Sequence, residues 1–179
     1  MSYVEAPTLV ATPGDPLANS YATLAEAELY HQAHPHATTW ATATAAQAAR
    51  ALVLATRLLD AQVKWQGVIA TQTQALAWPR LCAYDRHDRA LSSSVIPQAV
   101  KDATCEYARQ LLARDRTADR DSDVDGIARV KAGPVDVEFR DAPGGAKVLP
   151  DAVWLLLTGY GEVVRGGGRP RMSLPLVRA

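Results

Sequence analysis

Two short groups of residues in this chain have the spacing of metal ligands. The first occupies positions one, three, five and six of a calcium loop, in which alternating carboxylates converge on one cation: Asp121, Asp123, Asp125 and Gly126. The twelfth position should supply a bidentate glutamate, and here it is Ala132. The pattern therefore favours an acidic linking segment exposed to solvent over a calcium site.

The second group consists of three histidines, His31, His34 and His36. Pro35 interrupts the helix that would fix their geometry, and no cysteine or carboxylate is placed to complete a tetrahedral set of ligands. We interpret the group as the surface end of a helix. No cofactor or metal is predicted for the chain.

The residues give no support to nucleophilic catalysis. Ser92, Ser93 and Ser94 lack the G-x-S-x-G pattern of a nucleophile elbow, and they are better explained as the lead into a helix. The glycines at 166–168 have no Lys-Ser/Thr pair after them, so they predict a linker rather than a phosphate-binding loop. We therefore predict that the protein is not an enzyme.

The C-terminal residues 163–179 contain four arginines and no acid, and the arginines are Arg165, Arg169, Arg171 and Arg178. Guanidinium groups bind both phosphates and carboxylates through paired hydrogen bonds. The residues alone leave nucleic acid and an acidic protein surface open as partners. The whole chain carries 19 basic and 19 acidic residues, which argues against strong sequence-independent binding of nucleic acid.

Four helices are expected to form the main part of the chain. Capping boxes at Thr23–Glu26 and Thr44–Gln47 predict where the first two helices begin. Prolines are expected to begin the third and fourth helices, at Pro97 and Pro150. The first helix should run to about His34 and the fourth to Thr158. The second carries a stripe of small and apolar residues with helical spacing, which is Ala45, Ala48, Leu52, Ala55, Leu59 and Val63.

A long loop and a hairpin complete the predicted structure. Residues 67–94 read as an irregular loop, in which Trp78 and Pro79 are expected to be structural anchors; Trp154 is a third expected anchor. Apolar and charged residues alternate on both sides of residues 133–134, which predicts a β-hairpin over about 127–140.

These elements define a mainly α fold class, a small helical bundle with a β-hairpin and extended N- and C-terminal arms. The expected organisation is an extended arm over 1–19, a helical domain over 20–160 and a basic tail over 161–179. The longest apolar run, 152–157, is too short to span a bilayer, and residues 1–7 lack the features of a signal peptide, so no membrane partner is predicted.

Several segments of the chain resemble a family of small proteins encoded in the morphogenesis clusters of tailed phages and prophages. Members of that family are often labelled DnaT-like single-stranded-DNA-binding proteins, and they are similar to head–tail connector (adaptor) proteins of long-tailed phages. The resemblance spans about residues 19–160. The segments that carry it are Asn19–Tyr21, Ala25–Ala27, Tyr30–His31, Gln74–Arg80, Ile96–Glu106 and Arg129–Glu138.

This resemblance implies a structural virion protein of the neck, assembled in the host cytoplasm. The expected form is a ring, commonly of twelve subunits, docked between the portal protein and the tail-completion or tail-terminator protein. DNA would pass through the lumen with weak, non-specific contact, and the four tail arginines are candidates for portal binding. The alternative is a single-stranded-DNA-binding accessory protein of phage or prophage replication.

Overall fold

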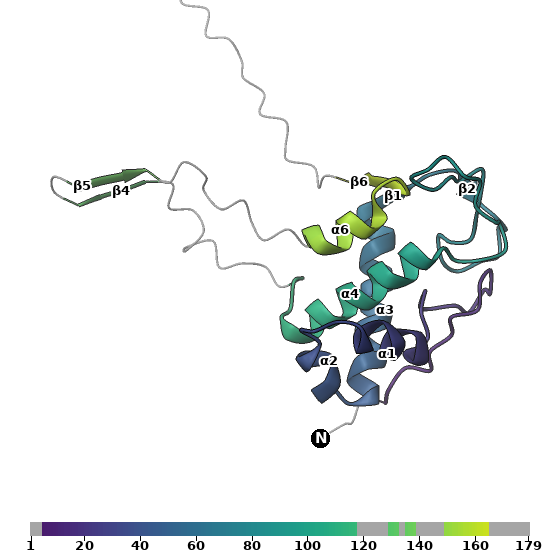
Figure 1. Cartoon of the computed structure of the whole chain (residues 1–179), viewed down its shortest axis with the longest axis horizontal. Helices are drawn as coiled ribbons and strands as arrows, with labels where there is room; N and C mark the ends of the chain where they lie inside the picture. Colours follow the sequence, from purple (N-terminus) through teal and green to yellow (C-terminus); the bar gives the residue numbers. More distant parts are fainter. Residues whose placement is uncertain (1–4, 118–128, 133–134, 139–148, 165–179) are drawn as a thin grey trace, which may run out of the picture.

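The computed structural model describes residues 5–117, 129–132, 135–138 and 149–164. Figure 1 shows a body of helices from which one β-hairpin stands apart. Five helices occur in the described residues, and the mainly α fold class with a β-hairpin that the sequence predicts is confirmed. Within these residues no helix combines the length and the apolar character needed to cross a membrane.

The first helices begin where the capping boxes predict. Helix α1 spans Leu24–Gln32 and α3 spans Ala45–Gln62; in each, the N-cap threonine and the third helical residue exchange hydrogen bonds. A short helix that the sequence analysis missed, α2 (Thr38–Thr42), lies between them and buries Trp40. The long aromatic side chain at its centre explains why this turn packs against the body.

The core lies where α3 meets α4 (Gln98–Ala113), and α6 (Asp151–Leu157) also packs against α4 (Figure 1). Pro97 is the N-cap of α4 rather than its first residue, because its ψ of 143° is extended. Most of the predicted α3 stripe is buried in this contact, whereas Ala45, in the first turn, is not. The buried stripe residues are Ala48, Leu52, Ala55, Leu59 and Val63.

In the part of the chain that the structure describes, three pairs of antiparallel strands accompany the helices. Strand β1 (Val63–Trp65) pairs with β6 (Gly161–Val163), and β2 (Val68–Ile69) pairs with β3 (Arg80–Leu81). Strands of two or three residues show no alternation in a sequence, so they were not predicted. The predicted hairpin is present as β4 (Arg129–Ala132) paired with β5 (Val135–Glu138).

The segment before α1 has no helix or strand in residues 5–19, and it folds back on itself. The side-chain oxygen of Asn19 accepts a hydrogen bond from the Val10 amide, and its nitrogen donates to the Thr8 carbonyl. The Asp15 carbonyl accepts from the Ala75 amide, which joins this segment to the loop between β2 and β3. The arm therefore lies against the body through main-chain contacts.

Candidate docking surface

The chain between β1 and α4, residues 66–97, forms one long loop that we call the docking loop. Trp78 holds it to the core: this side chain is 1% exposed, and its ring makes edge contacts with Trp65 and Tyr160 at centroid distances of 5.8 and 6.3 Å. The Trp78–Pro79 peptide bond is cis. The indole Nε1 of Trp78 has no hydrogen-bond partner among the described residues, whereas a buried indole N–H usually has one.

Arg80 fixes the two sides of the docking loop to each other. Its guanidinium donates to three main-chain carbonyls, those of Gln66 (2.5 Å), Gly67 (2.8 Å) and Ala77 (3.0 Å). A planar guanidinium carries several N–H donors that point in different directions, so it can bridge three carbonyl oxygens. A lysine ammonium is a compact charge and cannot span the same acceptors. The path of the loop is therefore set by hydrogen bonds to backbone atoms.

Asp60, in the last turns of α3, ties three more parts of the chain to this helix. Its carboxylate accepts hydrogen bonds from the Tyr21 hydroxyl, the Trp65 indole (3.0 Å) and the Ala77 amide (3.1 Å). Burial raises the pKa of Asp60 above its ordinary value despite these donors. The docking loop, β1 and the segment before α1 thus converge on one half-buried carboxyl group.

The outer part of the docking loop is an exposed apolar ribbon, formed by Val68, Ile69 and Leu81. Their side chains are 59%, 45% and 43% exposed. Val68 lies directly opposite Leu81 in the pairing of β2 with β3, so these two residues share one face of the ribbon and Ile69 is on the other. Gly67 permits the pairing, because its φ is +66° and a Cβ there would lie 2.1 Å from the Leu81 carbonyl oxygen. Exposed apolar residues gathered on a fixed loop are typical of a protein-binding surface.

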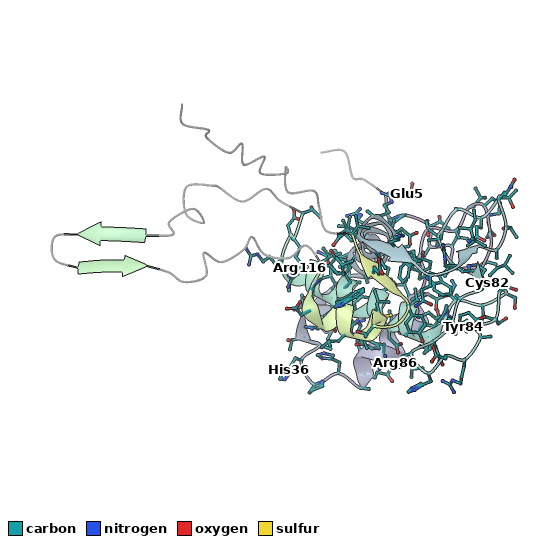
Figure 2. The ribbon with its side chains drawn as sticks, turned by 90° about the horizontal axis from the view of Figure 1, so that it is seen from above. Glu5, His36, Cys82, Tyr84, Arg86 and Arg116 are labelled. Carbon is teal, nitrogen blue, oxygen red and sulfur yellow. The ribbon has the colours of Figure 1, made fainter. Side chains whose placement is uncertain are left out.

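The far end of the docking loop is a polar turn. The Asp85 carboxylate accepts from the amides of His87 and Arg89 and from the Arg89 guanidinium, and these groups lower the pKa of Asp85 to about 2. Figure 2 shows Cys82 and Tyr84 at the right of the body and Arg86 farther along its lower side. Tyr84 is exposed, so the loop presents both apolar and polar groups to a partner.

The histidine cluster is only in part the surface helix end that the sequence suggested, since His36 is exposed whereas His34 is half-buried and His31 is buried. His31 is buried and lies against the Trp40 ring at a centroid distance of 4.4 Å, because it is on the face of α1 that meets α2. Burial lowers its pKa to about 4, and neither ring nitrogen has a hydrogen-bond partner among the described residues. His34 Nε2 lies 3.6 Å from the Glu106 carboxylate.

The structure separates the residues that the sequence singled out. Trp78 and Pro79 lie in the docking loop, while Trp154 lies on α6, partly buried against the core. The acidic segment 121–126, the glycines at 166–168 and the four arginines of the tail fall outside the described residues. No group of three or more metal-ligating side chains occurs in the described part of the chain.

Sequence reasoning missed Asp60 and Arg80 as organisers of the docking loop. Both are charged residues in otherwise apolar surroundings, and that pattern is the signal that could have found them. It also missed the charge of the body: residues 5–117 and 149–164 contain ten Lys and Arg against twelve Asp and Glu, so the helical body is slightly acidic.

The chain belongs to the family described as "Putative DnaT-like ssDNA binding protein", whose model matches residues 8–179. This match confirms the label of the family that the sequence resembles, and it extends over the C-terminal tail. No curated protein and no solved structure matches the chain. Of the two functions implied by the resemblance, the family description supports the alternative, single-stranded-DNA binding, and gives no support to the connector role.

Proposed function

We propose that the protein is a non-catalytic docking subunit, a head–tail connector that sits in the neck of a tailed phage between the portal and the tail-completion protein. The observation that carries this proposal is the exposed apolar ribbon of Val68, Ile69 and Leu81 on a loop fixed by Trp78 and Arg80. Apolar groups held in place before binding lose little conformational freedom on contact with a partner.

The charges of the chain support a docking role as well. The helical body is slightly acidic, whereas residues 163–179 carry four arginines, so one subunit offers two surfaces of different chemistry. We assign the apolar ribbon to one neighbour and the arginine tail to an acidic surface of the portal. Localisation in the neck of the virion, after assembly in the host cytoplasm, follows from this assignment.

The experiment compares two double variants in binding to the portal and tail-completion proteins of the same gene cluster. Val68→Ser with Leu81→Ser removes the apolar face that these two residues share on the ribbon, and the control Leu17→Ser with Leu29→Ser removes exposed leucines elsewhere on the body. We expect the first variant to lose co-sedimentation with one neighbour at least tenfold, while its thermal unfolding stays close to that of the parent. Equal docking by both variants would contradict the proposal.

The second candidate function is single-stranded-DNA binding in phage or prophage replication. It is supported by the family description and by the arginine-rich tail. An accessory protein of this kind would bind single strands at physiological salt without a portal partner. The dependence of DNA binding on salt separates this candidate from a connector, and the expected result is given in the Discussion.

A further inference from the structure

The β4–β5 hairpin divides its residues between two faces. Its register places Val130 opposite Val137 and Ala132 opposite Val135, so these four positions share one face. On the other face Arg129 stands opposite Glu138, and Lys131 stands opposite Asp136. The hairpin therefore has an apolar face and a face with two cross-strand pairs of opposite charge.

The basic and acidic residues of the hairpin are also separated between its two strands. Both charged positions of β4 are basic, Arg129 and Lys131, and both charged positions of β5 are acidic, Asp136 and Glu138. The two open edges of the hairpin thus differ in sign. A strand that extends this sheet would meet a cationic edge on one side and an anionic edge on the other.

A hairpin of this size needs a partner. An isolated two-stranded ribbon with four residues in each strand is marginally stable in water, and each of its edges has main-chain groups open to another strand. Within the described residues, β4 and β5 pair only with each other, so the outer edge of each strand has no strand beside it.

We propose that the occupant of these edges is a second copy of this chain, with β5 of one subunit paired to β4 of the next. This inference deepens the proposed function and rests on the ring that a connector forms. Successive hairpins in the order β4, β5, β4, β5 keep every neighbouring pair of strands antiparallel. Each acidic strand then lies between two basic strands, and each basic strand lies between two acidic ones.

Electrostatic repulsion disfavours the alternative arrangement, in which like strands of two subunits pair with each other. Pairing of β4 with β4, or of β5 with β5, sets like charges side by side, which destabilises a sheet. Pairing of β5 with the next β4 joins different surfaces of two subunits, a head-to-tail contact that closes into a ring when the rotation between subunits allows it. The hairpins of a ring would then form one continuous sheet with an apolar face and a charge-balanced face.

The test exchanges the charges of the two strands in the full-length chain. The swap variant carries Arg129→Glu, Lys131→Glu, Asp136→Lys and Glu138→Lys, which keeps the pairs within each hairpin complementary. At a junction between swap and parent chains, however, β5 of one and β4 of the next have the same sign. A control variant, Glu28→Lys with Arg57→Glu, exchanges exposed charges on the body instead.

Each variant is mixed with isotopically labelled parent chain, reassembled, and analysed by native mass spectrometry. We expect swap and parent chains each to assemble alone, and mixed assemblies to fall at least tenfold below the statistical proportion. The control should mix statistically. Statistical mixing of the swap variant would overturn the pairing while leaving the ring intact, and a preference for mixed assemblies would show like-strand pairing instead.

Two further outcomes separate the inference from the function beneath it. A parent chain that stays monomeric at every concentration, alone and with the portal protein, overturns both the hairpin pairing and the connector ring. In the second outcome, the swap variant is excluded from parent assemblies, but those assemblies bind neither the portal nor the tail-completion protein. That outcome supports the pairing and contradicts the connector.

Discussion

His31 is a polar residue kept in its neutral form by its surroundings. Its ring lies against Trp40 and is buried, and the charged or titratable groups that act on it include His34, just after α1, and Glu106 and Arg109 on α4. Burial is the largest influence and lowers the pKa of His31 from 6.5 to about 4. Charging this ring therefore opposes folding.

We expect acid to destabilise the protein through His31. Because the folded pKa is below the unfolded one, the contribution of His31 is fully present above pH 6.5 and is lost as the pH falls towards 4. The expected loss in unfolding free energy is about 2 kcal/mol, after allowance for partial solvent screening. Urea unfolding at several pH values measures it.

Two variants isolate this contribution of His31. His31→Phe keeps a ring against Trp40 and has no titrating group, so it should flatten the fall in stability between pH 6.5 and 4. His36→Gln removes an exposed histidine and should leave the fall as it is. If the pH dependence were the same in all three proteins, another group would be its cause.

At the scale of elements, Asp60 is the point where α3, β1, the docking loop and the segment before α1 meet. Asp60→Ala leaves the Tyr21 hydroxyl, the Trp65 indole and the Ala77 amide without their acceptor. Each buried donor without a partner costs about 1–3 kcal/mol. Because Ala77 is only partly buried, water can replace the lost acceptor there, and we expect a total at the lower end of the sum, about 3–5 kcal/mol in unfolding free energy. Chemical denaturation measures this loss.

Asp60→Asn is the matched variant. Its amide oxygen still accepts from the donors of Tyr21 and Trp65, but its nitrogen meets the Ala77 amide donor to donor. We expect roughly half the loss of the alanine variant, with the change concentrated in amide exchange of the docking loop. An alanine variant as stable as the parent would show that the carboxylate does not hold these elements together.

The elements differ in how well the sequence predicts them. The capping boxes locate the starts of α1 and α3, and the alternation around residues 133–134 locates the hairpin, because these signals are local. The strands β1, β2, β3 and β6 depend on partners distant in the chain, and two or three residues carry no periodic signal. Asp60 and Arg80 were missed for the same reason, since their partners are set by the tertiary fold.

The whole molecule combines a slightly acidic body with a tail of four arginines, so any DNA contact should depend on the tail. Four phosphates neutralised on a single strand give a slope of about −3 in log affinity against log salt, and binding should be largely lost at about 150 mM salt. A filter-binding titration over salt concentration tests this. Changing Arg165, Arg169, Arg171 and Arg178 to Gln should bring the slope near zero.

The opposite result would change the assignment of function. Tight binding to single strands at physiological salt that survives the loss of all four arginines requires a DNA surface on the rest of the chain. Single-stranded-DNA binding, the function in the family description, would then replace the connector as the leading interpretation.

Because Arg80 holds the docking loop through main-chain atoms, the shape of the loop does not depend on the side chains that would contact a partner. All three of its acceptors are main-chain oxygens, which every amino acid provides. The exposed side chains of Val68, Ile69 and Leu81 contribute nothing to this fixation, so they are free to diverge while the loop keeps its path. Related chains can therefore acquire a new partner through a few surface substitutions, each of which leaves the docking loop folded.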